Sequence, residues 1–269
     1  KEVVVAKVLT CEDHPDSDHL HVCTVTTDGI NSIQVVCGAP NVAVGQKIMF
    51  AQVGATLPGD IVIKDTKLRG QASSGMICSM QEIGVDEELV APADKDGIRV
   101  LPEDAPLGVD VMDYLGMNDW VFDVDLTPNR SDCLSVYNIA KEVGALLKKP
   151  VKPVDVMIQE GDDILSKIKV TNKAPELCHR FTATMVEGAK IGRSPLWMEH
   201  RLQCAGMRPI SNLVDVTNYV MMELGQPLHA YDYTTVAGKE IVVRTAEKDE
   251  HITTLDGLDR ALTEEMILI

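Results

Sequence analysis

Apolar and polar positions alternate in short runs along the first hundred residues, with the two-residue period of a β-strand. Four such runs stand at residues 3–9, 21–27, 32–37 and 47–53, and shorter ones stand at 61–63 and 76–78. The second run leads into Asp28-Gly29, a common turn dipeptide. This series of short strands, with no long helical period among them, predicts a small OB-like β-barrel.

A helical period follows a connector at 101–120 that is rich in proline, glycine and aspartate. Apolar residues at 136, 139, 140, 143, 146 and 147 would share one face of an α-helix. We expect Ser131 or Asp132 to cap its start, and Lys148-Lys149 with Pro150 to end it. Asp123 and Asp125 precede it with the spacing of one strand face, so segment 121–150 is predicted as a strand and a helix.

A second linker at 150–165 leads into a part of the chain with both helical and strand patterns. Strands are predicted at 168–171, 180–186 and 241–244, and helices at 196–205 and from 211 to 224. A hairpin with a type I′ turn is predicted at Asp256-Gly257. The chain ends on an apolar run at 266–269, so we expect its last domain to be cut short. The predicted domains are 1–100, 101–160 and 161–269.

Composition and charge restrict the possible classes of function. The 269 residues are 45% apolar and 25% charged, which is ordinary for a folded soluble protein. No apolar run approaches the length of about 20 residues that a membrane helix needs, so we expect no membrane partner. The net charge is −16, and none of the three predicted domains is basic as a whole, which argues against nucleic-acid binding by a broad positive field. Seven scattered cysteines without a CxxC pair indicate reduced thiols and a cytoplasmic protein.

Two stretches in the predicted barrel carry candidate chemistry. Lys64, Lys67 and Arg69 precede a glycine- and serine-rich loop that includes Ser74. Such a loop is either an ordinary barrel connection or a set of amides, hydroxyls and cations for an RNA backbone. The other stretch is a run of histidines and aspartates, His14, Asp16, Asp18, His19 and His21. Its spacing is no standard zinc pattern, so we interpret it as a polar turn and predict no metal site.

A third group of polar residues interrupts the apolar segment near the predicted helix at 211–224. It comprises Asp215, Thr217, Asn218, Glu223, Gln226 and His229. The group could line a polar pocket at a helix end, or its members could be structural. It contains no serine or cysteine nucleophile with a partnered base, so a covalent triad is not indicated.

Several of these motifs resemble a known family. Residues 3–82 resemble the tRNA-binding OB domain of some methionyl-tRNA synthetases, on the motifs at 14–18, 35–41, 54–58, 68–70 and 74–79. The stretches at 127–135, 195–198, 214–220 and 226–232, in this order, resemble the β subunits of bacterial phenylalanyl-tRNA synthetases. One departure is His19, where that family commonly has lysine or arginine, and it implies a weaker grip on RNA.

The resemblance implies an α+β multidomain chain: an OB-like barrel, a strand-helix segment and the first, truncated part of an editing domain. The whole enzyme would be an α2β2 ligase that joins phenylalanine to tRNA with ATP and Mg2+ at the α subunit, so this chain would need no cofactor. The chain would bind tRNA and contribute Thr217, Asn218 and His229 to a site that hydrolyses mischarged tyrosyl-tRNA. Lys64, Lys67, Arg69 and Ser74 are the candidate tRNA contacts. The alternative is a stand-alone OB-fold tRNA-binding module without catalysis.

Overall fold

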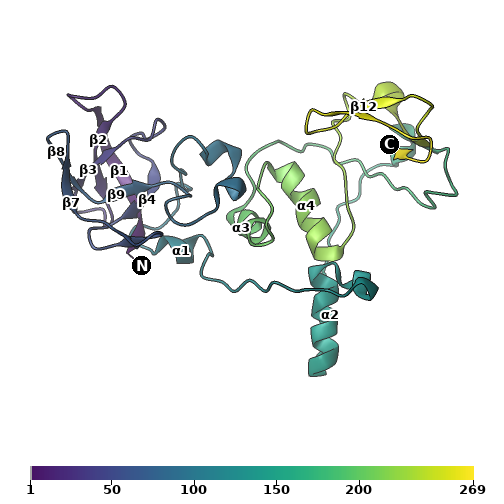
Figure 1. The fold of residues 1–269 in the computed structure, drawn as a ribbon, viewed down its shortest axis with the longest axis horizontal. Coiled ribbons are helices and arrows are strands. Elements are labelled where there is room, and N and C mark those ends of the chain that lie inside the picture. Colours follow the sequence, from purple (N-terminus) through teal and green to yellow (C-terminus); the bar gives the residue numbers. More distant parts are fainter. Residues whose placement is uncertain (1) are drawn as a thin grey trace. The chain divides into compact units, whose positions relative to one another are not determined.

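The computed structural model describes residues 2–269, which form two compact units (Figure 1). The first unit contains the chain up to Lys148 together with Ile191–Leu228, and the second contains Lys149–Lys190 and His229–Ile269. The part of the chain from 161 onward is thus shared between the two units, while the domain boundaries near 100 and 160 stay predictions. Among the described residues, no helix is both long enough and apolar enough to span a membrane.

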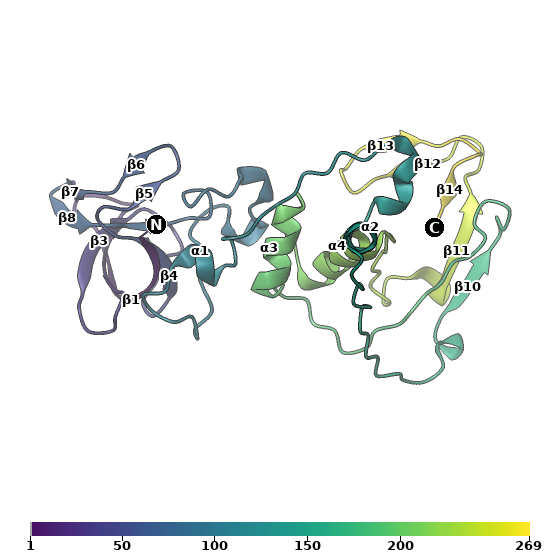
Figure 2. The same cartoon turned by 90° about the horizontal axis from the view of Figure 1, so that it is seen from below.

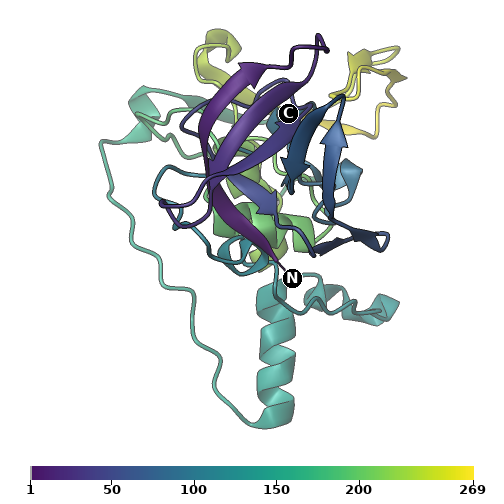
Figure 3. The same ribbon diagram turned by 90° about the vertical axis from the view of Figure 1, so that its left-hand side faces the viewer.

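A five-stranded antiparallel sheet forms the base of the first unit. Its order is β3-β2-β1-β4-β9, and it curls into a half-barrel (Figure 3). The strands are β1 (Val3–Asp13), β2 (His21–Thr26), β3 (Ile33–Cys37), β4 (Lys47–Ala51) and β9 (Met76–Cys78). Five of the six predicted strand runs therefore form the expected curved sheet, while the run at 61–63 lies outside it and closure into a complete barrel remains a prediction.

Two short hairpins extend this sheet. They are β5 (Thr56–Leu57) with β6 (Ile61–Val62), and β7 (Asp65–Leu68) with β8 (Gln71–Ser74). Strand β8 lies beside β3, where the backbone N–H of Val36 donates to the Ser73 hydroxyl at 3.0 Å and the Gln34 amide donates to the Ala72 carbonyl at 3.0 Å. These bonds hold the second hairpin across the open side of the sheet.

The central strands bury both of their faces. Val5 and Met49 pack into one apolar core with the segment around Val111, while Val8 and Phe50 pack into a second core inside the curl. A strand buried on both faces has a continuous apolar sequence, as in 48–51, where the side-chain period of two no longer shows. The first core attaches the short helices η1 (Glu87–Leu89) and α1 (Val111–Tyr114) to the sheet, and η2 (Pro92–Asp94) lies between them in the chain.

The three longer helices of the first unit follow the predicted patterns. They are α2 (Val136–Leu147), α3 (Leu196–Cys204) and α4 (Asn212–Leu224). Gly225 ends α4 with φ of +82°, a conformation that favours glycine. The predicted cap of α2 was wrong, because Ser131 and Asp132 lie in the preceding η3 (Pro128–Cys133). The cap is instead Ser135, whose hydroxyl accepts from the backbone N–H of Asn138 at 3.2 Å.

Two predicted strands do not form. Residues 121–127 and 180–186 have no regular secondary structure, although both contain alternating apolar positions. A strand needs a neighbour to satisfy its backbone groups, and neither segment pairs with another strand among residues 2–269. Their apolar side chains are correspondingly exposed, as Phe122 and Val186 show.

The second unit is built on a three-stranded sheet (Figure 2). Strand β11 (Glu240–Thr245) lies between β10 (Lys169–Asn172), which is parallel to it, and β14 (Ile267–Leu268), which is antiparallel. The short helices η4 (Ile164–Ser166) and η5 (Ala237–Lys239) belong to the same unit. Val243, at the centre of β11, is fully buried.

The predicted hairpin of the second unit forms, but with a different turn. Strands β12 (His251–Thr253) and β13 (Asp259–Ala261) pair across the connection 254–258. A type I′ turn needs positive φ at both central residues, and here Gly257 has φ of +78° while Asp256 does not. The Asp256 carboxylate instead accepts from the backbone N–H of Leu258 at 3.1 Å and from the Thr254 hydroxyl, which stabilises a longer loop.

Candidate functional site

An open groove of about 660 Å³ lies in the first unit. Four stretches of chain form its walls: the end of β3 with the following loop, the residues from β6 to β7, the residues from β8 to Glu82, and the loop 95–98. Lys64 and Lys95 are its cations, and Glu82 and Asp96 are its carboxylates. Because it has two charges of each sign, the groove offers hydrogen-bonding groups but produces no strong net electrostatic field.

The loop that carries Lys95 is fixed by a single asparagine. The Asn41 side chain donates to the Ile98 carbonyl at 2.8 Å and accepts from the Ile98 backbone N–H at 2.9 Å. A Cβ atom at Gly97 would lie 2.2 Å from the Asn41 side-chain oxygen, so this position requires glycine. Asn41 ends the motif at 35–41 that carries part of the family resemblance, which gives that motif a structural reason.

The candidate tRNA contacts are divided by the alternation of strand β7. Lys64 lines the groove together with Thr66 and Leu68, whereas Lys67 is exposed and is not among the lining residues. Ser74 is half-buried at the end of β8 and does not line the groove either. Sequence reasoning missed Lys95, which lies between two aspartates in a segment without a recognisable motif.

Arg69 and His14 together anchor the hairpin of β7 and β8 to the turn that follows β1. The Arg69 guanidinium donates to the Asp16 carbonyl at 2.8 Å. His14 is 3% exposed, and its Nδ1 accepts from the Asp16 backbone N–H at 3.1 Å, so Nε2 carries the proton and donates to the Leu68 carbonyl at 3.1 Å. Both ring nitrogens are therefore engaged in holding the turn.

The other members of the histidine and aspartate run are on the surface. The His19 Nδ1 lies 2.9 Å from the Asp18 carboxylate, and this hydrogen bond lowers the pKa of Asp18. His21 contacts Asp13 at 3.4 Å. These contacts are those of the polar turn that the sequence suggests.

Among residues 2–269, a cluster of possible metal ligands occurs where η3 meets α2. Oxygen and sulfur atoms of Asp132, Cys133 and Glu142 lie within 4.8 Å of one another. The Arg130 guanidinium already occupies this cluster, with Nη2 3.0 Å from the Asp132 carboxylate, 2.7 Å from the Glu142 carboxylate and 2.8 Å from the Cys133 sulfur. Its geometry is that of an ion-pair network on the helix surface.

The three predicted editing residues lie in different units. Thr217 and Asn218 are neighbours on α4 in the first unit, and His229 begins the second segment of the other unit. The Thr217 hydroxyl donates to the Val214 carbonyl at 2.7 Å, one turn back in the same helix. The His229 ring lies 6.2 Å from that of Tyr231. Their assembly into one site stays a prediction.

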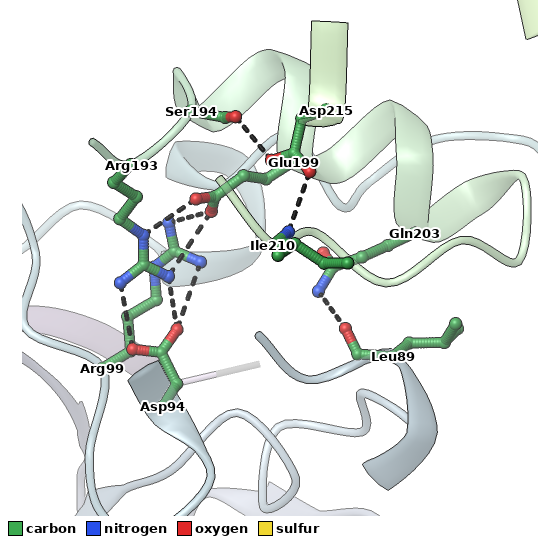
Figure 4. A network of polar contacts seen from close by, with 9 residues as sticks. All are labelled: Leu89, Asp94, Arg99, Arg193, Ser194, Glu199, Gln203, Ile210 and Asp215. Carbon is green, nitrogen blue, oxygen red and sulfur yellow. Dashed lines mark hydrogen bonds and ion pairs between the residues drawn. The ribbon is translucent and has the colours of Figure 1, made fainter. Parts of the chain in front are cut away.

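Asp215, which the sequence grouped with these residues, has a structural role. It is 1% exposed, and its carboxylate accepts from the Ile210 backbone N–H at 2.8 Å and from the Ser194 hydroxyl (Figure 4). These two bonds connect Asp215 of α4 with the segment before α3 and with the loop before α4. Buried polar atoms of this kind are normally satisfied by such local partners.

Four charged residues form a network inside the first unit, in which Asp94, Arg99 and Glu199 are buried and Arg193 reaches in from the surface (Figure 4). Arg99, 4% exposed, contacts Glu199 of α3 at 2.6 Å and Asp94 at 3.7 Å. Arg193 donates to Glu199 at 2.8 Å and to Asp94 at 3.0 Å. Burial alone would lower the pKa of Arg193, but the hydrogen bonds to Asp94 and Glu199 raise it overall. The charges of the two arginines and the two carboxylates compensate each other, and the network joins α3 to the segment after the curled sheet.

Comparisons with known proteins identify two separate parts of the chain, and the second of them spans residues of both compact units. A family model described as a putative tRNA binding domain matches residues 3–110, and one described as a B3/4 domain matches 177–269. Phenylalanine–tRNA ligase β subunits from Geobacillus kaustophilus and Moorella thermoacetica are 48% and 47% identical to it over 270 residues. The alignments cover 100% of this chain and 34% and 33% of those relatives, so the chain spans a third of their length. Among solved structures, a MetRS related protein from Pyrococcus horikoshii is 19% identical over 39% of this chain and 84% of that chain, with a TM-score of 0.28.

Proposed function

The chain belongs to the family of phenylalanine–tRNA ligase β subunits, and on that premise we propose that it binds tRNA through the groove of its first unit. The groove lies within the residues that match the tRNA-binding family model, and this coincidence is the observation that carries the proposal. Lys64 and Lys95 would contact phosphates, while the exposed backbone and hydroxyls of the walls would contact sugars and bases.

The charge of the groove favours recognition by shape over a strong electrostatic grip. Glu82 and Asp96 stand in the same walls as the two lysines, and the whole chain carries a net charge of −16. We therefore expect few phosphate contacts and a shallow dependence of affinity on salt, with a slope that falls by about 0.7–0.9 for each contact removed. Single-stranded or bulged RNA is the form in which bases can enter such a groove.

The test is tRNA binding by the full-length ligase with Lys64→Ala, Lys95→Ala or both, measured by filter retention across a salt series. Lys67→Ala is the matched control, because Lys67 is exposed, has the same charge and does not line the groove. Lys64→Ala and Lys95→Ala should each weaken tRNA binding and reduce the dependence of affinity on salt, and Lys67→Ala should do neither. An equal effect of Lys67→Ala would assign binding to the hairpin surface and contradict the groove.

The second part of the proposed function is hydrolysis of mischarged tyrosyl-tRNA. The B3/4 match spans residues 177–269 and so includes Thr217, Asn218 and His229, which favours a synthetase subunit over a stand-alone OB-fold module. Tyrosine differs from phenylalanine by one hydroxyl, and an apolar synthetic pocket rejects an added hydroxyl poorly. A separate pocket that binds the hydroxyl can select the wrong ester for attack by a positioned water. Ligation itself, with ATP and Mg2+, would take place on the α subunit of an α2β2 assembly.

A further inference from the structure

Cys11 and Cys23 stand directly opposite each other on the neighbouring strands β1 and β2. The type of pair follows from the end of this ladder, where the His14 backbone N–H donates to the Leu20 carbonyl at 2.9 Å. Hydrogen-bonded and non-hydrogen-bonded pairs alternate along an antiparallel ladder. Cys11 and Cys23, three pairs further on, therefore occupy a non-hydrogen-bonded position, where Cα atoms are about 4.5 Å apart and side chains come closest.

Both thiols belong to the same apolar core. Cys23 is fully buried in the core inside the curl, and Cys11 packs against that core while remaining partly accessible. The Cys11 thiol has one weak hydrogen bond, to the Val42 carbonyl at 3.7 Å. Burial, and after it the contact with Cys11, raises the pKa of Cys23. A solute can therefore reach the Cys11 sulfur, whereas the Cys23 sulfur is shielded from solvent.

We propose that Cys11 and Cys23 form a reversible intramolecular disulfide when the protein meets a peroxide. A Cα separation of about 4.5 Å falls within the range of about 4.4–6.8 Å that disulfides require, so the strands need not move apart. The Cys11 thiol loses its proton, the thiolate attacks one peroxide oxygen and the O–O bond breaks, and the departing hydroxide takes up that proton, which leaves a sulfenic acid and one water. The Cys23 sulfur then attacks the Cys11 sulfur, the S–O bond breaks and a second water leaves. The two thiols lose two electrons, which reduce hydrogen peroxide to two waters.

The crosslink would close the connection between β1 and β2 into a covalent ring. That connection contains His14 and Asp16, which hold the hairpin of β7 and β8 beside the groove through Leu68 and Arg69. Oxidation should therefore slow amide hydrogen exchange in residues 12–22, because the turn can no longer open by separating the strands.

The chain offers a matched control on the same sheet face. Cys37 of β3 also lies in this core. It stands opposite His21 of β2, whereas the β3 residue opposite Cys23 is Val35, two residues earlier. Such diagonal neighbours are about 7–8 Å apart at Cα, which is too far for a disulfide in an unmoved sheet. Cys37→Ser should therefore leave the crosslink intact, whereas Cys11→Ser should abolish it.

The experiment treats the folded full-length protein with hydrogen peroxide, blocks the remaining thiols with N-ethylmaleimide and maps peptides by mass spectrometry. A protease that cuts at aspartate separates the two cysteines at Asp16 or Asp18, and it separates Cys23 from Cys37 at Asp28. We expect a crosslinked Cys11–Cys23 peptide in wild type and in Cys37→Ser, which dithiothreitol removes.

Three results would overturn the proposal: conversion of Cys11 to a sulfinic acid while Cys23 stays free, a crosslink that involves Cys37 or a second molecule, or no loss of either thiol. The peptide map of the wild-type protein decides among these outcomes by itself, so the conclusion does not depend on how well a cysteine variant folds.

Discussion

At the scale of single residues, His14 illustrates how burial changes the meaning of a sequence pattern. His14→Ala removes both of its ring hydrogen bonds and leaves the Leu68 carbonyl and Asp16 N–H without their partners. We expect a loss of about 1–3 kcal/mol in the free energy of unfolding, measured by urea denaturation. His19→Ala is the control, because His19 is exposed and its variant should unfold at the wild-type midpoint. Equal loss in both variants would mean that the stability comes from the polar turn as a whole and not from the two ring hydrogen bonds of His14.

His229 carries the residue-scale prediction about editing. In the full-length ligase, His229→Ala should slow hydrolysis of tyrosyl-tRNA by about 10- to 1000-fold, the usual cost of one lost positioning group. Charging with phenylalanine should stay nearly unchanged, since we propose that ligation takes place on the α subunit. Thr217→Ala should act more mildly, because the Thr217 hydroxyl already donates to its own helix backbone. Parallel loss of charging and editing in His229→Ala would identify a structural histidine.

At this scale the sequence could predict which residues have suitable side chains, but not which of them lie in the groove or in the interior. The lysines and arginine near 64–69 were recognisable as candidate cations, but only the strand alternation of the structure separates Lys64 from Lys67. Lys95 enters the groove because Asn41 fixes a loop more than fifty residues away in sequence. Such contacts between distant segments leave no local signal.

At the scale of elements, the ends of α2 show the limit of capping rules. Ser131, Asp132 and Ser135 are all suitable caps, and local preference cannot choose among them. Ser135→Ala should lower the free energy of unfolding by about 0.5–2 kcal/mol, because the Asn138 N–H loses its acceptor. Ser131→Ala is the matched control, since Ser131 lies in η3 and does not cap the helix. Helix content by circular dichroism and thermal unfolding measure the difference, and a larger loss in Ser131→Ala would contradict this assignment.

Helices were predicted more reliably than strands for a physical reason. A helix satisfies its backbone within one segment, so the apolar faces of α2 and α4 sufficed to locate both. A strand depends on a neighbour, and the alternation at 121–127 and 180–186 could not reveal that none pairs with them among the described residues. The loop at 254–258 likewise depends on the Asp256 carboxylate, which the Asp-Gly dipeptide alone did not indicate.

At the scale of the whole molecule, the first unit is assembled from segments that are far apart in the chain. Asp94 and Arg99 follow the curled sheet, and Arg193 and Glu199 lie near α3, about a hundred residues later. No period or motif in the sequence links these two regions, because a buried ion pair is a property of tertiary structure. The matches to two separate family models divide the chain into two parts, whereas the network joins α3 of the later part to the earlier one.

This network leads to the prediction at the largest scale. Glu199→Gln keeps the size of the side chain but removes one of two buried negative charges, so Arg99 and Arg193 must share Asp94. Breaking a buried pair in this way costs about 3–5 kcal/mol in the free energy of unfolding. Asp18→Asn is the control, because it changes the same charge in an exposed pair of the same unit and should leave the unfolding midpoint close to wild type. If α3 docks through apolar packing alone, Glu199→Gln will unfold with the midpoint of the control. If the charged network holds α3 in place, the variant will unfold at a lower midpoint than the control. Hydrogen exchange will then show α3 opening before the curled sheet.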